Sequence, residues 1–158
     1  MHIATNSGKI EISLEVRTAE IAKNFSKMLK KGDVVFLYGE IGVGKTTFLR
    51  HMINSLQKNK NLKLTEVTSP TFNLVNEYQV GNLLIQHYDL FRLKNINETK
   101  NIGLLENYKK ILTLVEWPEK IENKTINSIN LFFEYEEGTE KRFLTIKGLT
   151  KERLNEIR

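Results

Sequence analysis

The sequence predicts an α/β fold of the P-loop nucleotidase type, with three layers and a mixed sheet. Residues 34–38 (V-V-F-L-Y) form an apolar, β-branched run that is typical of a buried strand. Residues 39–46 (G-E-I-G-V-G-K-T) follow as a glycine-rich loop, and the next apolar positions recur at helical spacing. A second buried strand at 111–115 and several alternating segments indicate a parallel core with antiparallel hairpin strands.

The chain before the loop predicts one strand and one helix. Residues 9–15 alternate polar and apolar side chains, as a strand with one buried face does. Thr18 is the predicted N-cap of a helix whose apolar positions recur up to Gly32. Strand, helix, strand, loop and helix in this order are typical of an α/β protein.

Residues 39–46 match the phosphate-binding pattern G-x-x-x-x-G-K-[ST]. Glycines let the backbone form a concave nest whose N–H groups point at phosphate oxygens, and the start of the helix adds unpaired amides. We expect Lys45 to reach the phosphates and Thr46 to offer its hydroxyl to a phosphate-bound Mg²⁺. The predicted nucleotide site comprises Gly39, Glu40, Ile41, Gly42, Val43, Gly44, Lys45, Thr46 and Thr47.

A β-hairpin is predicted after this first unit. The helix is expected from Lys45 to Leu56, and residues 57–63, rich in Lys and Asn, are expected to form a surface loop. Pro70 does not fit a central strand and holds its predecessor extended, so it predicts a stiff lead into a strand at 72–79. Gly81 and Asn82 then form a turn into a second strand at 83–92.

The last third of the chain carries shorter elements around the strand at 111–115. We predict short helices at 95–108 broken at Gly103, strands at 128–135 and 141–147 joined by a turn, and a polar helix from Thr150.

Composition narrows the class of protein. A length of 158 residues predicts a single P-loop domain over residues 1–158, and the absence of cysteine excludes disulfides, thiol nucleophiles and Cys-ligated zinc. We find neither a signal-peptide layout nor an apolar run near the ~20 residues that cross a bilayer, so we expect a cytoplasmic protein without a membrane partner. The net charge of +5 fits nucleic acid, an acidic partner or a solvated surface. No interleaving of aromatic and basic residues supports direct nucleic-acid readout, and no DNA partner is expected.

Two carboxylates at strand ends are candidates for catalysis. Hydrolysis at a phosphate loop needs an acid that holds Mg²⁺ or its water, and a group that places the attacking water. Glu116 follows the apolar run 111–115, and Asp89 closes a more mixed strand. Ligands in open α/β sheets bind at such strand ends, so either residue could be the metal-side acid. The alternative for both is a solvent-facing carboxylate.

Three further residues have a functional and a structural interpretation. Thr71 could sense the γ-phosphate as a switch threonine, or could simply begin a strand. His87 shares a strand face with Asp89, but a lone histidine is more often structural than catalytic. Trp117 could stack on a base or pack in the core, and its residue type alone favours the core.

Four blocks resemble, in order and spacing, the bacterial TsaE (YjeE) family. They are G-E-I-G-V-G-K-T-T at 39–47, S-P-T-F at 69–72, H-Y-D-L-F-R at 87–92 and V-E-W-P at 115–118. This resemblance implies an ATPase of tRNA threonylcarbamoyladenosine biosynthesis, with ATP and Mg²⁺ as cofactors. It also implies work with the TsaB and TsaD proteins, which modify the adenosine next to the anticodon of ANN-decoding tRNAs, so that tRNA is involved indirectly.

The resemblance also implies roles for single residues. It assigns Lys45 to the phosphates, Thr46 and Glu116 to Mg²⁺ or its water, and Trp117 to a place beside the nucleotide instead of in the core. Asp89 becomes a residue required for the ATPase cycle.

The resemblance further places Thr71 in a segment that responds to nucleotide. Phe91 stands where the family often has tyrosine, so no hydroxyl acts at that position.

Other nucleotide-binding classes fit less well. A small GTPase would need an [NT]-K-x-D motif, and the nearest strings, at 59–62 and 123–126, lack the final Asp. A small-molecule kinase of the P-loop class shares the size and the loop, but usually carries an arginine-rich lid. The arginines here are scattered at Arg17, Arg50, Arg92, Arg142, Arg153 and Arg158. A third possibility is a binding module whose hydrolysis only resets its partners, which agrees with the resemblance.

Overall fold

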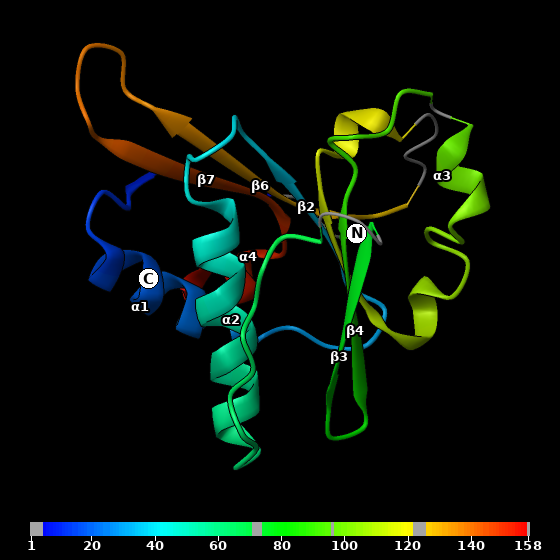
Figure 1. Ribbon diagram of the computed structural model, residues 1–158. Coiled ribbons are helices and arrows are strands. Elements are labelled where there is room, and N and C mark those ends of the chain that lie inside the picture. Colours follow the sequence, from blue (N-terminus) through cyan, green and yellow to red (C-terminus); the bar gives the residue numbers. More distant parts are fainter. Residues whose placement is uncertain (1–4, 71–73, 96, 122–125, 158) are drawn as a thin grey trace.

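The protein forms one seven-stranded mixed sheet with helices against it (Figure 1). The computed structural model describes residues 5–70, 74–95, 97–121 and 126–157. The strand order is β1-β7-β6-β2-β5-β4-β3. The strands are β1 (Thr5–Glu11), β2 (Val34–Tyr38), β3 (Val75–Val80), β4 (Leu83–Asp89), β5 (Leu112–Glu116), β6 (Ile129–Tyr135) and β7 (Arg142–Leu149).

The centre of the sheet is parallel and its flanks are antiparallel. Strand β2 pairs in parallel with β5 and β6, and β5 pairs in parallel with β4. The antiparallel pairs are β3 with β4, β6 with β7, and β1 with β7. The predicted mixed sheet, with a parallel core and antiparallel hairpin strands, is therefore confirmed.

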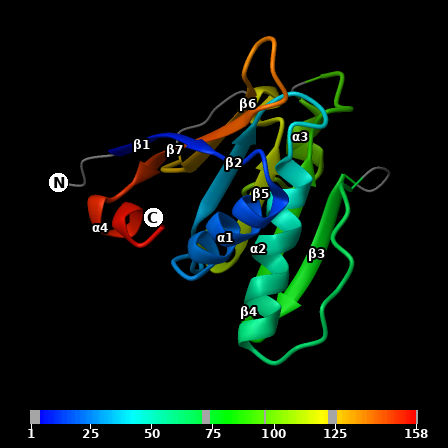
Figure 2. The same cartoon turned by 90° about the vertical axis from the view of Figure 1, so that its left-hand side faces the viewer.

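Alternation along β2 divides the interior into two cores. Val35 and Leu37 belong to a core under α1 (Glu15–Ser26), α2 (Lys45–Asn59) and α4 (Lys151–Asn155). Val34 and Phe36 face the opposite core. The segments over this second core include residues 102–105, which follow α3 (Glu98–Asn101), and the 3₁₀ turns η1 (Tyr108–Lys110) and η2 (Pro118–Lys120). Figure 2 shows α1 and α2 together on one side of the sheet. Because both faces are covered, the three-layer expectation is also confirmed.

Aromatic contacts fix α2 to the sheet. Phe48 is fully buried, and its ring packs edge-on against Phe25 of α1 and Phe133 of β6, at 5.7 Å between centroids in both pairs. Such contacts add to the free energy of burial and restrict the helix to one orientation. The amino end of α2, where the glycine-rich loop ends, is thereby held near the carboxyl end of the central strand β2.

The start of α1 differs from the prediction. Strand β1 covers residues 5–11 instead of 9–15, and α1 begins at Glu15, so Thr18 is not its N-cap. The helix begins early because the Leu14 carbonyl already accepts hydrogen bonds from the amides of Arg17 and Thr18. The buried Thr18 hydroxyl donates to the Ile12 carbonyl over 3.0 Å and ties the helix to the strand end.

The end of α2 also differs from the prediction. The helix continues to Asn59, so the first part of the predicted surface loop 57–63 is helical. Gln57 is buried, and its side-chain amide donates to the Thr65 hydroxyl over 2.9 Å and accepts from the Thr65 amide over 3.2 Å. These two bonds hold the returning chain against α2. The polar residues 57–63 had predicted a surface loop, but the hydrogen bonds of Gln57 allow this polar side chain to be buried.

The hairpin β3–β4 is confirmed, but its second strand is shorter than predicted. Strand β4 ends at Asp89 instead of at residue 92. The Asp89 carboxylate accepts the amide of Phe91 over 3.0 Å, and the Leu93 amide donates to the Leu90 carbonyl, so the chain turns immediately after the strand. Residues 72 and 73 of the other predicted strand lie outside the described residues.

The predicted elements near the carboxyl end are present. Strands β6 and β7 form a hairpin, and the Thr150 hydroxyl caps α4 by accepting the amide of Arg153. Helix α3 ends at Asn101, two residues before Gly103. Within the described ranges, none of the helices combines the length and the apolarity that a bilayer span requires.

Gly148 allows a close approach between β7 and the chain before β6. A Cβ there would lie 2.3 Å from the Ser128 carbonyl oxygen, and φ is +92°. Gly138 has a similar φ of +78°, but a Cβ there meets nothing within 4 Å. We predict that Gly148→Ala lowers the free energy of unfolding by about 2 kcal/mol more than Gly138→Ala, because only the first adds a steric clash to the backbone strain.

Denaturant unfolding of both variants measures this difference. Gly138→Ala controls for the left-handed backbone, and equal losses in the two variants would contradict the proposed close contact.

Candidate functional site

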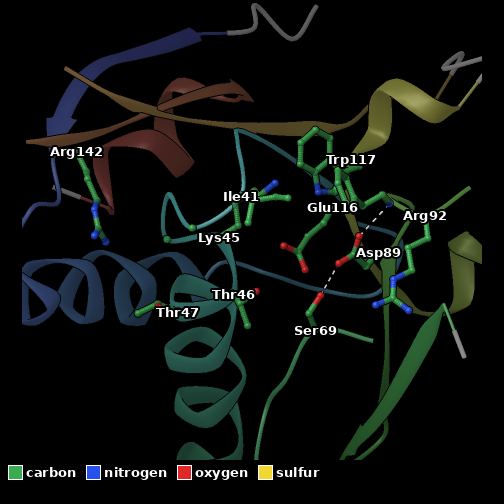
Figure 3. A pocket seen from close by; sticks show the side chains of 13 residues that line it. Ile41, Lys45, Thr46, Thr47, Ser69, Asp89, Arg92, Glu116, Trp117 and Arg142 are labelled. Carbon is green, nitrogen blue, oxygen red and sulfur yellow. Dashed lines mark hydrogen bonds between the residues drawn. The ribbon is translucent and has the colours of Figure 1, made fainter. Parts of the chain in front are cut away.

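A cleft of 360 Å³ lies where the glycine-rich loop meets the carboxyl ends of β4 and β5 (Figure 3). The residues around it come from the loop, the start of α2 and four other parts of the chain. They are Ile41, Gly42, Gly44, Lys45, Thr46, Thr47, Ser69, Asp89, Phe91, Arg92, Glu116, Trp117 and Arg142.

The loop is shaped by its glycines and held by β6. Gly39 has φ +146°, and a Cβ there would lie 2.8 Å from the Phe133 carbonyl oxygen, so no larger residue fits. The Tyr135 hydroxyl donates to the Gly42 carbonyl over 2.7 Å. Gly44 has a left-handed backbone conformation and is the residue directly before α2. The unpaired amides at the start of this helix face the cleft. The predicted loop residues line the cleft except Gly39, Glu40 and Val43, the last of which is buried in the core.

Lys45 is a buried cation at the floor of this cleft. Its residue is 5% exposed, its ammonium donates to the Gly39 carbonyl, and it lies 4.1 Å from the centroid of the Trp117 ring. Burial lowers the pKa of Lys45, whereas the charges of Glu116 and Asp89 act to raise it. The ammonium is therefore only partly compensated by the protein, which suits a group that binds a further anion.

Trp117 lies at the rim of the cleft and at the edge of the second core. Its backbone is left-handed, with φ +60°, which is unusual for a residue other than glycine. The ring packs on Phe91 at 4.8 Å between centroids, and Phe91 is 46% exposed. Trp117 packs on the second core, as its residue type favoured, and it also lines the cleft, so the two interpretations of this residue do not exclude each other.

Glu116 ends β5 and pairs with a histidine on the neighbouring strand. Its carboxylate is 2.7 Å from the Nε2 of His87, and the side chains are 3% and 0% exposed. Glu116 reaches the cleft, but His87 is not among the residues that line it. Of the two, only Glu116 is placed to contact a ligand.

Asp89 ends β4 directly beside Glu116, its partner in the β4–β5 register. One oxygen of its carboxylate accepts the Ser69 hydroxyl, and the other accepts the amide of Phe91 over 3.0 Å (Figure 3). Ser69 belongs to the irregular segment that returns along α2 (Figure 1). The structure therefore joins this segment to a strand-end carboxylate. Thr71, the predicted switch residue, lies outside the described residues.

Four cleft residues had no assigned role in the sequence-based prediction. Ser69, Phe91 and Arg92 fall inside recognisable sequence blocks, so a signal for them was present. Arg142 had no such signal, because β7 lies outside these blocks. Its amide donates to the Ser13 hydroxyl and its carbonyl accepts the Ile12 amide, which ties the start of β7 to the segment between β1 and α1.

A second hollow of 110 Å³ adjoins the cleft on the side of α1. It shares Gly44, Thr47 and Arg142 with the cleft and is also lined by Ser13 and Glu15. Hydrogen bonding from His51 and the charge of Arg50, both on α2, lower the pKa of Glu15. An acidic side chain, Glu15, and a basic one, Arg142, therefore both line the hollow.

The oxygen atoms of the cleft fit a magnesium ion that is also coordinated by phosphate and water. Thr46 and Glu116 offer the hydroxyl and carboxylate oxygens that Mg²⁺ prefers. No group of three or more His, Asp or Glu side chains able to hold a metal occurs in the described part of the chain. Phosphate and water would have to supply the remaining ligands, as is usual for Mg²⁺ at phosphate sites.

Comparison with protein families identifies one matching family. The model of the TsaE family, described as threonylcarbamoyl adenosine biosynthesis protein TsaE, matches residues 12–144. This range includes the loop and both strand-end carboxylates.

Individual relatives and one solved structure agree with this match. A Rickettsia felis protein named tRNA threonylcarbamoyladenosine biosynthesis protein TsaE is 39% identical over 69% of this chain and 61% of its own length. A Rickettsia conorii protein of that name is 38% identical over 71% and 62%. The match therefore spans less than two thirds of both Rickettsia proteins. A Nostoc protein of that name is 31% identical over 87% of this chain and 85% of its own length.

The solved structure is the crystal structure of YdiB from Bacillus subtilis. It superposes with a TM-score of 0.73 at 25% identity, and the alignment covers 99% of this chain and 94% of that one.

We predict that Lys45→Met stabilises the ligand-free protein by about 1 kcal/mol, because it removes a desolvated charge while keeping an unbranched side chain. Burial lowers the pKa of Lys45 in the folded protein. At pH values below that pKa the lysine is charged, and its burial then destabilises the folded state. The stabilisation should therefore be complete below the pKa of Lys45 in the folded state and shrink as pH rises through that pKa.

Thermal unfolding at neutral and alkaline pH tests this prediction. Lys31→Met, at an exposed lysine, is the control and should change little at either pH. A destabilised Lys45→Met protein would show that the ammonium is fully compensated by its neighbours.

Proposed function

The chain belongs to the TsaE family, and we propose that it is a Mg²⁺-dependent P-loop ATPase that supports threonylcarbamoyladenosine modification of tRNA. The observation that carries the proposal is the cleft itself. It joins a buried lysine, the amides at the start of α2 and two adjacent strand-end carboxylates, Asp89 and Glu116. This is the combination of groups that phosphoryl transfer to water requires.

The loop and Lys45 would bind the phosphates of ATP. The ammonium of Lys45 exchanges its bond to the Gly39 carbonyl for phosphate oxygens, and the amides after Gly44 contact the same oxygens. Trp117 covers the ammonium and, with Phe91, limits the access of water. These contacts favour the charge that develops on the phosphates during transfer.

The strand-end carboxylates would organise the attacking water. Thr46 and Glu116 would hold a magnesium ion or its water, and when bound that ion would neutralise charge on the phosphate oxygens. Asp89 lies next to Glu116 and orients the nucleophile once Ser69 releases one of its oxygens. Release of Ser69 also changes the position of its segment, so the state of the nucleotide is transmitted to the surface.

We infer that the nucleoside extends from the cleft toward the second hollow. The γ-phosphate end must face Asp89 and Glu116, so the rest of ATP extends past Thr47 toward Ser13 and Arg142. The Arg142 guanidinium and the polar groups of α1 are then beside the sugar and base.

Partner proteins would supply the chemistry on tRNA. We propose TsaB and TsaD as partners, with tRNA bound indirectly and the assembly in the cytoplasm. Two apolar side chains at the mouth of the cleft support docking there: Ile41 is 67% exposed and Phe91 is 46% exposed. Exposed apolar groups beside a nucleotide site are suited to a partner that senses the nucleotide.

Lys45→Ala should abolish ATP hydrolysis and weaken ATP binding at least about a hundredfold, because it removes the charge that offsets the phosphates. Lys58→Ala, an exposed lysine at the other end of the same helix, is the matched control and should behave like the parent. Phosphate release and calorimetric titration with ATP measure both quantities. A Lys45→Ala protein that hydrolyses ATP like the parent would refute the proposal.

Complex formation with TsaB and TsaD should depend on ATP. We expect co-elution of the three proteins with a non-hydrolysable ATP analogue and Mg²⁺, and dissociation with ADP, because only the γ-phosphate reaches Asp89 and its link to Ser69. Size-exclusion chromatography of the mixture measures this. Nucleotide-independent binding would contradict the coupling, and phosphorylation of a metabolite without partners would indicate a kinase.

A further inference from the structure

A buried histidine lies behind the candidate catalytic carboxylate and has no assigned role. His87 is completely buried on β4, and its Nε2 is 2.7 Å from the Oε2 of Glu116. Ile85 and Leu114, two residues before His87 and Glu116, belong to the core beneath α2. Strand alternation therefore directs both side chains toward α2 and the loop.

The direction of this hydrogen bond follows from the surroundings of the ring. The Nδ1 of His87 is buried and has no hydrogen-bond partner among the described residues. A proton on Nδ1 would leave a buried N–H unpaired, whereas a proton on Nε2 is donated directly to the Glu116 carboxylate. The geometry therefore favours the tautomer in which Nε2–H donates to Oε2.

We propose that His87 is a positioning residue that holds the Glu116 carboxylate in the orientation that binds Mg²⁺ or its water. The inference rests on the proposed ATPase function. The Nε2–H fixes one carboxylate oxygen, and in the described part of the chain no other side-chain bond to Glu116 occurs. The second oxygen is then left for the ligand in the cleft, which Glu116 lines and His87 does not. Groups that orient a metal ligand in this way typically contribute 10- to 100-fold to metal affinity or activity.

A purely structural role is the competing interpretation. The bond joins β4 to β5, which are already paired through the backbone from Ile85 to Asp89. If it served only this pairing, replacement of His87 would change stability and leave the folded protein with normal Mg²⁺ dependence. A positioning role instead changes the response to Mg²⁺ in protein that is fully folded.

Three variants separate these interpretations. His87→Gln keeps an N–H near the position of Nε2, and His87→Phe keeps the ring without a donor. Glu116→Gln removes the carboxylate itself. Circular dichroism first establishes that each variant is folded.

Affinity for a non-hydrolysable ATP analogue, measured by calorimetry with Mg²⁺ and with EDTA, is the readout apart from activity. We expect His87→Phe to bind the analogue like the parent in EDTA but to lose about 10-fold or more of the gain that Mg²⁺ provides. Turnover with saturating Mg²⁺–ATP should fall by a similar factor. His87→Gln should stay within about threefold of the parent in both measurements.

The double variant tests whether His87 acts through Glu116. His87→Phe added to Glu116→Gln should cause no further loss of the Mg²⁺ effect or of turnover, because the group that His87 orients is already gone. A full second loss, or a folded His87→Phe protein with the parental Mg²⁺ effect, would overturn the proposal.

Nitrogen NMR of the unsubstituted protein tests the same geometry if His87→Phe does not fold. The histidine ring should carry its proton on Nε2, and a proton on Nδ1 alone would overturn the proposal. The proposed function fails separately: if Glu116→Gln retains parental turnover and Mg²⁺ effect, Glu116 is not the metal-side acid whatever His87 does.

Discussion

Burial of the Lys45 ammonium is the constraint on which the cleft depends. A lysine that is 5% exposed is costly unless polar groups surround it. Here the Gly39 carbonyl accepts its hydrogen bond, the Trp117 ring covers it, and nearby carboxylates oppose the effect of burial on its pKa. The left-handed backbone of Gly39 and Trp117 serves this arrangement, because it directs a carbonyl and a ring toward one cation.

The parallel pairing of β4 with β5 creates the opposite wall of the cleft. Asp89 and Glu116 are register partners at the carboxyl ends of these strands, although they are 27 positions apart in the chain. Two carboxylates so close would repel each other if both were unpaired. Each is instead hydrogen-bonded, Asp89 to Ser69 and Glu116 to His87. The two partners differ in their surroundings, since His87 is buried on strand β4 and Ser69 lies in an irregular segment.

That irregular segment connects the cleft with the far end of α2. Gln57 holds Thr65 through two hydrogen bonds, Val67 is buried in the core, and Ser69 reaches Asp89. The segment is thus attached at both ends while its backbone has no strand or helix between them. Loss of the bond between Ser69 and Asp89 would free one end of the segment without breaking a strand pairing, which is the property that the proposed nucleotide-dependent interaction needs.

Local patterns in the sequence determined the strand–loop–helix unit around Lys45, the mixed sheet and the two strand-end carboxylates, because alternation, helical spacing and glycine requirements act over a few residues. The tertiary structure alone decided that β7 brings Arg142 to the cleft, that Gln57 is buried, and that Trp117 packs on the second core while it also lines the cleft. These features arise from the pairing of strands and the packing of helices that are distant in the chain. Patterns within a short stretch of sequence do not show such contacts.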